Sequence, residues 1–259
     1  MHWVLQNNLF QEAEWDNLVR ALERRDIPYS VHKVVPFIGE LEPDLYLPDR
    51  EAICFGSYAM RHVAKRKGWK PGVYDLEPYD HEEQMRHWGR HMLNADAYVL
   101  PFSAVRLERP MFVRPTTDCK YFTGAVFQPE EFRDWQHKVV DLHEDYGDSL
   151  TGDTSVMVCE PKNVAVEVRF WIVDEKPITA SVYKRGGRVI YDSVVDQRFW
   201  TLAWALVTPI SVDKWNPVRA FVVDICETGD GELKVVEINT INAAGFYAGD
   251  VAKIVEALN

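Results

Sequence analysis

The sequence predicts an α+β protein in which a small α/β lobe precedes a larger domain built mainly from antiparallel β-strands. In the first hundred residues, short apolar strand segments alternate with amphipathic helices, a pattern typical of a largely parallel sheet. After about residue 109, strand-like segments joined by short turns replace that alternation. We therefore place the domain boundary between residues 1–108 and 109–259, within one composite chain of enzyme size.

Apolar periodicity defines the elements of the N-terminal lobe. Helical spacing occurs in one segment between the first two strands and in two segments after the third strand. Ser57 follows the third strand and is expected to cap the next helix. The predicted strands are residues 3–6, 29–35 and 52–56, and the predicted helices are residues 11–26, 58–67 and 81–93.

In the second domain, strand candidates follow one another at short intervals, and three helical segments interrupt them. This order favours antiparallel sheets with helices packed against them. The strand candidates are residues 111–115, 123–127, 155–160, 163–174, 176–187, 188–195 and the two arms of a hairpin at 221–239, and the helices are residues 130–146, 198–207 and 248–258.

Composition narrows the class of protein. The 29 basic and 40 acidic residues give a net charge of −11, which disfavours nucleic acid as a partner because phosphates would be repelled. Four scattered cysteines without a CxxC pair fit a reducing compartment. No window of uncharged apolar residues is long enough for a membrane span. We therefore expect a cytoplasmic protein with no membrane partner.

The segment "FVVDICETGDGELKVVEIN", residues 221–239, contains its own turn. Asp230-Gly231 between two apolar runs predicts a hairpin with a two-residue loop. That register places Glu227 opposite Lys234, a favourable charge pair, and Asp224 opposite Glu237. The hairpin therefore brings two carboxylates face to face inside strands that are otherwise rich in valine.

Facing carboxylates repel each other, and burying them unpaired costs several kcal/mol per ion. Asn239 lies two residues beyond Glu237 and so shares its face of the strand. Two carboxylates and an amide carbonyl form an oxygen-only ligand set, which suits Mg²⁺ or Mn²⁺. Magnesium held by few protein groups usually completes its coordination with water and substrate phosphates. Asp224, Glu237 and Asn239 are therefore predicted metal ligands for a nucleoside triphosphate; the alternative is that both carboxylates face solvent.

An aspartate on one strand, "EIN" on the next and a loop with glycine and aromatic residues together resemble the metal-binding signature of ATP-grasp enzymes. Further segments match in order over about residues 109–250. The first hundred residues resemble the small α/β lobe that precedes the grasp in this superfamily. The chain looks closest to a clade of phage and bacterial ATP-grasp proteins of unassigned substrate. The resemblance implies two α+β subdomains that grip a nucleotide.

The resemblance also implies roles for residues outside the hairpin. Arg114, in "MFVRP", stands where these enzymes carry a nucleotide-binding lysine, and Lys120 belongs to a loop that covers the phosphates. Glu160, in "VMVCEP", would mark the adenine and ribose pocket. Arg169 and Lys184 would bind the phosphates and assist catalysis. A guanidinium fork and an ammonium point charge both suit that task.

In ATP-grasp ligases, a carboxylate is activated as an acyl phosphate and an amine then attacks it. The resemblance therefore implies an ATP- and Mg²⁺-dependent ligase that forms a C–N bond between a carboxylate and an amine, on a small molecule or a peptide or protein terminus. Two alternatives stay open: a kinase on the same scaffold and a nucleotide-binding module without turnover. Two loops, Gln6–Asn8 and Asn242–Tyr247, have no assigned role at this point.

Overall fold

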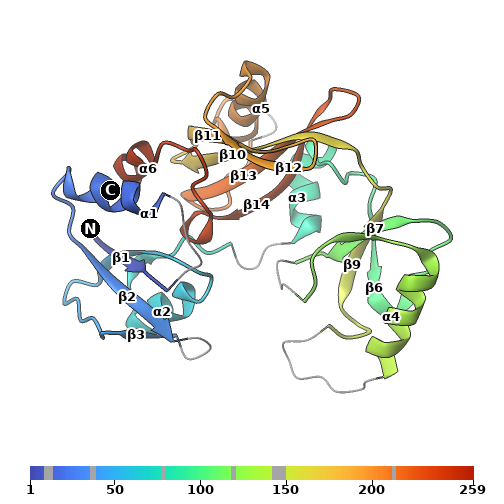
Figure 1. The fold of residues 1–259 in the computed structure, drawn as a ribbon, viewed down its shortest axis with the longest axis horizontal. Helices are drawn as coiled ribbons and strands as arrows, with labels where there is room; N and C mark the ends of the chain where they lie inside the picture. Colours follow the sequence, from blue (N-terminus) through green and yellow to red (C-terminus); the bar gives the residue numbers. More distant parts are fainter. Residues whose placement is uncertain (9–13, 36–38, 77–79, 118–120, 142–149, 212–213) are drawn as a thin grey trace. The chain divides into compact units, whose positions relative to one another are not determined.

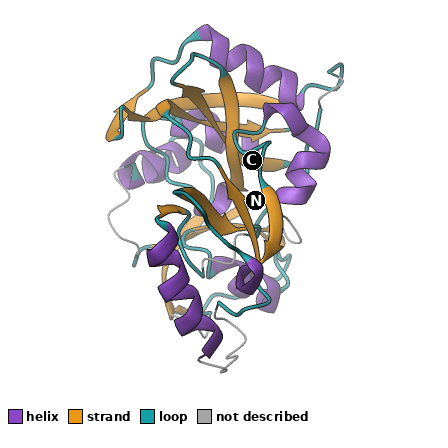
Figure 2. Ribbon diagram, turned by 90° about the vertical axis from the view of Figure 1, so that its right-hand side faces the viewer, coloured by secondary structure: helices purple, strands orange, loops and turns teal. Residues whose placement is uncertain are grey.

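The computed structural model describes residues 1–8, 14–35, 39–76, 80–117, 121–141, 150–211 and 214–259 (Figure 1). The chain divides into two compact units, residues 1–77 with 164–259 and residues 78–163. Among the described residues, the first unit contains two sheets and the second contains one. Figure 2 distinguishes the helices from the strands in both units.

The N-terminal sheet of the first unit is mainly parallel, as the alternation of its elements predicts. Its strands lie in the order β3-β2-β1-β4-β5, and only β3 pairs antiparallel. The three longer strands match predicted segments, whereas the edge strands β3 and β5 have no period-two pattern that could have indicated them. The strands are β1 (His2–Gln6), β2 (Tyr29–Val35), β3 (Glu40–Glu42), β4 (Glu51–Phe55) and β5 (Lys70–Gly72).

Two helices belong to this lobe, α1 (Trp15–Glu23) and α2 (Met60–Lys67). The expectation that Ser57 caps α2 is wrong, because the helix begins at Met60 after Ala59. The Ser57 hydroxyl instead donates to Gln6 Oε1 at 2.8 Å, and its backbone N–H donates to the same oxygen at 2.8 Å. Ser57 thus ties the end of β4 to the end of β1.

The C-terminal sheet is antiparallel throughout, in the order β12-β11-β10-β13-β14. Phe170 and Trp171 are consecutive on β10 and therefore point to opposite faces. Phe170 meets Trp200 of α5 edge to face, and Trp171 packs in a core that includes α6. Figure 1 shows α5 lying over one face of this sheet. The elements are β10 (Val164–Val173), β11 (Lys176–Arg185), β12 (Arg188–Asp192), α5 (Gln197–Val207), β13 (Ala220–Thr228), β14 (Leu233–Thr240), a 3-10 turn (Ile241–Ala243) and α6 (Val251–Leu258).

One core joins the two sheets of the first unit. Trp3 and Leu5 of β1 belong to the same buried cluster as Trp171, Val222 and Leu258. Burying these apolar surfaces together explains why residues 1–77 and 164–259 form one compact unit although they are distant in sequence. The predicted boundary at residue 108 describes a change in the sequence pattern, which is a different property from compactness, and it stays a prediction.

The second unit contains a four-stranded sheet in the order β6-β9-β7-β8, with antiparallel pairing. Phe132 of α4 packs with Phe102, Val113 and Val156 in its core. None of the described helices is long and apolar enough to cross a membrane. The elements are α3 (His81–Trp88), a 3-10 turn (Gly89–His91), β6 (Tyr98–Pro101), a 3-10 turn (Phe102–Ala104), β7 (Met111–Pro115), β8 (Ala125–Phe127), α4 (Pro129–Asp141) and β9 (Ser155–Cys159).

Candidate active site

The β13–β14 hairpin pairs Asp224 with Glu237, which confirms the predicted juxtaposition. The route to that register differs from the expectation. The loop contains three residues instead of two, because the Thr228 N–H bonds to Glu232 O at 2.9 Å and Gly231 closes the turn with φ +86°. A bulge between Asp224 and Ile225 then shifts the register back by one residue. The longer loop and the bulge offset each other at Asp224.

The predicted pairing of Glu227 with Lys234 is wrong for the same reason. Between the loop and the bulge, Glu227 lies opposite Leu233, and Lys234 lies opposite Cys226. Glu227 accepts a bond from Arg198 Nη2 of α5 at 2.8 Å instead. The charge of Glu227 is therefore compensated by another element and not by its own hairpin.

Two neighbouring rows of side chains cross the same face of β10, β13 and β14. Directly opposite residues share a face, so Trp171 and Val222 form one row and Arg169, Asp224 and Glu237 form the next. We call these the apolar row and the ionic row. The apolar row is fully buried in the core, while the ionic row places charged groups two residues further along each of β10 and β13. A charged row inside such strands requires compensation.

Arg169 provides that compensation for Asp224. Its Nε donates to Asp224 Oδ1 at 2.8 Å and its Nη2 donates to Oδ2 at 2.7 Å, a bidentate pair. The two residues are only 8% and 2% exposed, so the pair is buried. The sequence named both residues but gave no reason to join them, since they lie on strands far apart in the chain.

Burial and charge act in opposite directions on this pair. Burial raises the pKa of the Asp224 carboxyl, and the nearby Glu237 adds to that effect, while the Arg169 guanidinium favours the carboxylate. Burial disfavours the charged form of Arg169, but the Asp224 carboxylate outweighs burial and raises the pKa of the guanidinium. The pair therefore stays ionised because each partner stabilises the charge of the other.

Glu237 and Asn239 lie side by side at the half-buried end of β14. Asn239 Nδ2 donates to Glu237 Oε1 at 2.9 Å, so the amide carbonyl of Asn239 is turned away from that bond. Each carboxylate oxygen of Asp224 has a second lone pair beyond the one that accepts from Arg169. Among the described residues, no three His, Cys, Asp or Glu side chains gather at one point. The available donors are thus two carboxylates and an amide carbonyl, an oxygen-only set that fits Mg²⁺ or Mn²⁺.

Lys184 contacts the acid that precedes Arg169 on β10. Its Nζ lies 2.8 Å from Glu167 Oε1, and the Tyr183 hydroxyl donates to Glu167 Oε2 at 2.8 Å. Burial raises the pKa of the Tyr183 phenol, and the charges of Asp224 and Glu167 act in the same direction, so the phenol stays a neutral donor. Arg169 and Lys184 face the three carboxylates of Glu167, Asp224 and Glu237, which leaves one negative charge in excess. A cationic ligand suits this charge balance.

Three tyrosines extend the site in a way that the sequence did not indicate. Tyr247 stacks between Tyr183 and Tyr191, with ring centroids 5.2 Å and 5.1 Å away. The Arg169 guanidinium carbon lies 5.0 Å from the Tyr247 ring centroid. Tyr247 adopts a left-handed backbone with φ +50°, which is unusual for a bulky residue. Its place in the loop after Asn239 was the only available signal.

The remaining predicted residues belong to the second unit. Arg114 is on β7, opposite Met157 of β9, and Glu160 follows β9 and forms an ion pair with Arg109. Burial lowers the pKa of His81, and the positive charge of Arg114 acts in the same direction. Lys120 lies outside the described residues. The structure thus brings Arg169, Asp224, Glu237 and Asn239 together and describes Arg114 and Glu160 in their own unit.

With this geometry established, comparison with protein families decides the family. The model of an ATP-grasp domain, the third family of its clade, matches residues 55–258, most of the chain. The chain belongs to this ATP-grasp family. The family match confirms the resemblance drawn from the Asp224, Glu237 and Asn239 signature.

Solved structures with the same fold cover nearly the whole ATP-grasp chain. A RimK domain ATP-grasp protein from Sphaerobacter thermophilus is 17% identical, with a TM-score of 0.61 and 98% of each chain covered. The D-cycloserine synthetase DcsG is 13% identical, with a TM-score of 0.63, covering 100% of this chain and 98% of its own. A D-alanine–D-alanine ligase from Bacillus anthracis is 11% identical, with a TM-score of 0.57, covering 99% and 96%. At these identities the likeness establishes the fold. No curated protein matches the sequence.

Proposed function

We propose that this ATP-grasp protein is an ATP- and Mg²⁺-dependent ligase that joins a carboxylate to an amine. The ionic row is the observation that supports this proposal most directly. Asp224 and Glu237 are opposite each other with Asn239 beside them, and Arg169 holds Asp224 in place. A buried row of charge in an apolar sheet is retained at a cost in desolvation, which points to a role beyond folding.

The proposed roles follow from the donor chemistry. Asp224, Glu237 and Asn239 would hold the divalent cation, which offsets phosphate charge when it is bound with ATP. Arg169 and Lys184 would bind the transferring phosphoryl group and orient it. Arg114 and Lys120 would contribute positive charge from the second unit, and Glu160 would contact the nucleoside. No protein nucleophile is needed, because orientation and electrostatics lower the barrier.

The proposed reaction balances in two steps. A carboxylate oxygen of the first substrate attacks the γ-phosphorus of ATP, the bond to the β-phosphate oxygen breaks, and ADP leaves. The amine nitrogen of the second substrate then attacks the acyl carbon, phosphate leaves, and the proton lost by the amine ends on phosphate. The family relatives named as a D-alanine–D-alanine ligase and a D-cycloserine synthetase support this class of chemistry.

The test is release of ADP and phosphate from Mg·ATP, followed by ³¹P NMR and mass spectrometry with mixtures of carboxylates and amines. A ligase should release both only when a carboxylate and an amine are present. A kinase would leave phosphate on its acceptor, and a binding module would bind ATP without release. Either outcome would refute the ligase.

Two variants test the site itself. Asp224→Ala and Glu237→Ala should abolish turnover, whereas Glu232→Ala, a carboxylate at the exposed end of the same hairpin, should not change it. Unaltered turnover and unaltered Mg·ATP affinity in the first two variants would show that the ionic row does not hold the metal.

A further inference from the structure

Three segments that the sequence singled out without a role meet at one hollow of the first unit. The hollow has a volume of about 140 Å³ and lies between α1, the end of β4 and the loop after β14. Phe55, Gly56 and Ser57 come from the "CFGS" turn, and the loop residues come from "NAAGFY". Gln6, from the "LQNN" segment, holds Ser57 from below through two hydrogen bonds.

The floor of the hollow is fixed by two buried side-chain amides. Asn242 is 3% exposed, donates to Cys54 O at 2.7 Å and accepts from the Tyr74 N–H at 2.7 Å. The Gly56 N–H donates to Asn242 O at 2.9 Å. A Cβ at Gly56 would lie 2.6 Å from the Gln6 Cβ, so only glycine fits there. The shape of the hollow is therefore set before any ligand arrives.

The position in the sheet is one where ligands bind for topological reasons. β1 lies between β2 and β4, so the chain leaves β1 toward one side and later returns on the other. At such a switch point, connections after neighbouring parallel strands diverge and leave a crevice at their carboxyl ends. Phe55 and Gln6 are the last residues of β4 and β1. The loop on the other side of the hollow continues directly from β14, which carries Glu237 and Asn239.

The lining of the hollow is apolar and uncharged. Trp15, Leu18, Phe55 and Phe246 form its larger walls, and no charged side chain is among its described lining residues. The Phe55 and Phe246 rings stack with centroids 6.0 Å apart. An engineered apolar cavity of about 150 Å³ binds benzene, so this volume suits a side chain as large as that of leucine or phenylalanine.

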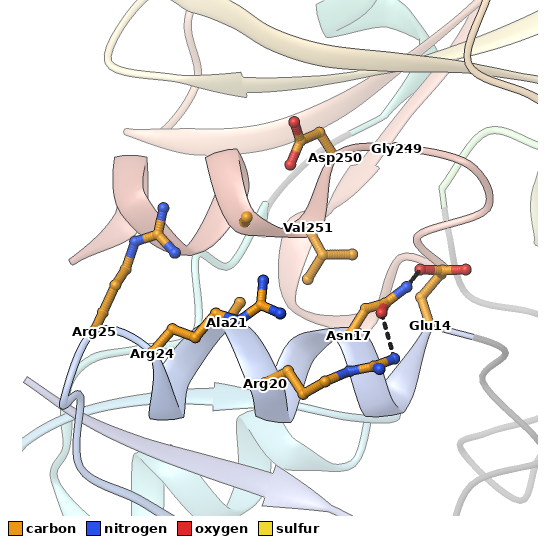
Figure 3. Close-up of a pocket in the computed structure, with 10 residues that line it drawn as sticks. Glu14, Asn17, Arg20, Ala21, Arg24, Arg25, Gly249, Asp250 and Val251 are labelled. Carbon is orange, nitrogen blue, oxygen red and sulfur yellow. Dashed lines mark hydrogen bonds between the residues drawn. The ribbon is translucent and has the colours of Figure 1, made fainter.

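A second hollow beside α1 has the opposite chemistry. It measures about 280 Å³ and is lined by Arg20, Arg24 and Arg25 with the start of α6 (Figure 3). Those arginines are exposed, and two of them have partners, since Arg20 bonds to Asn17 at 2.7 Å and Arg25 pairs with Glu256. Exposed, internally paired charge is ordinary solvated surface. The uncharged hollow is the better ligand site.

We propose that the uncharged hollow binds the apolar side chain of an amino-acid substrate of the ligase, and so selects leucine- or phenylalanine-sized substrates. This inference rests on the proposed function for the reaction but not for the binding. The reacting carboxylate or amine group stays outside the apolar hollow. The pocket lining then decides which amino acid is used, and the ionic row decides what happens to it.

The test measures binding and turnover separately. Isothermal titration with Mg²⁺ and a non-hydrolysable ATP analogue measures the affinity for L- and D-leucine, phenylalanine, alanine, aspartate and lysine. ADP release with each amino acid, with hydroxylamine added to trap an acyl phosphate as a hydroxamate, measures turnover. Leucine or phenylalanine should exceed alanine by at least about tenfold, because each apolar methylene in a pocket is worth about 10-fold or more.

Two variants change the pocket in opposite directions. Ala244 has an extended backbone and lines the hollow, so Ala244→Leu should fill it and remove the preference for leucine and phenylalanine. Trp15→Ala should enlarge it and shift the preference toward tryptophan. Ala205→Leu, on α5 and away from the hollow, is the matched control and should change nothing.

The outcomes separate the two proposals. If apolar amino acids bind, Ala244→Leu abolishes binding and no hydroxamate or ADP forms, then the pocket stands and the ligase fails. If hydroxamates form equally from alanine, aspartate and leucine, or if Ala244→Leu behaves like Ala205→Leu, the ligase stands and the pocket inference is wrong. No binding and no turnover of any amino acid refutes the pocket inference as well.

Discussion

The apolar row and the ionic row occupy the same face of the same three strands, one step apart, yet they are compensated differently. Trp171 and Val222 are fully buried against apolar neighbours from both sheets of the first unit. Arg169 and Asp224 are almost equally buried but are balanced only by each other and by their polar neighbours. Burial alone therefore does not distinguish core from site, whereas the means of compensation does.

The largest expected effect comes from breaking the buried pair. Asp224→Ala should lower the free energy of unfolding by about 3–5 kcal/mol, because it leaves the Arg169 guanidinium buried without its partner. Urea denaturation followed by tryptophan fluorescence measures this change. The same variant should lose ATP turnover.

The double substitution Arg169→Met with Asp224→Leu serves as the control for that prediction. Replacing a buried ion pair by apolar residues of similar volume is often neutral or stabilising, so stability should return while turnover stays lost. A double variant as unstable as Asp224→Ala would show that the ionic row is needed for folding. The contrast between the two rows would then disappear.

The apolar row should respond to crowding instead of charge. A Cβ at Gly249 would lie 2.8 Å from the Trp171 ring, so Gly249→Ala should lower the free energy of unfolding by about 1–3 kcal/mol. Mg·ATP affinity of the folded protein should not change, which titration calorimetry can check. Adding Trp171→Phe should restore part of the stability, because the smaller ring makes room. A large loss of nucleotide affinity in Gly249→Ala would mean that the rows are coupled.

The sequence could predict the ionic row only where local rules apply. The pairing of Asp224 with Glu237 follows from turn residues a few positions away, so it could be placed without a structure. The three-residue loop and the bulge each changed the register, and their cancellation at Asp224 is not readable from residue types. The longer strands and helices could be predicted because each has its own apolar period.

Interactions between distant segments were beyond the sequence. Arg169 pairs with Asp224 because β10 and β13 are neighbours, an order that depends on the whole sheet. Tyr247 reaches Arg169 through a strained loop conformation that its residue type disfavours. Ser57 was expected to cap a helix, but Gln6 from another strand occupies its hydrogen bonds. In each case a partner far along the chain decides the outcome.

The smallest expected effect on stability is the sharpest test of the comparison. Glu237 is half buried at the end of the ionic row, opposite another carboxylate, so Glu237→Gln keeps the shape and removes a repulsive charge. The free energy of unfolding should change by no more than about 0.5 kcal/mol. The Mg²⁺ concentration needed for half-maximal ATP binding should rise at least about tenfold, since even outer-shell partners of metal ligands are worth about 10–100-fold. Glu232→Gln, at the exposed hairpin end, is the control and should change neither quantity. If Glu237→Gln instead destabilised the fold and spared the Mg²⁺ dependence, Glu237 would belong with the apolar row as a structural residue.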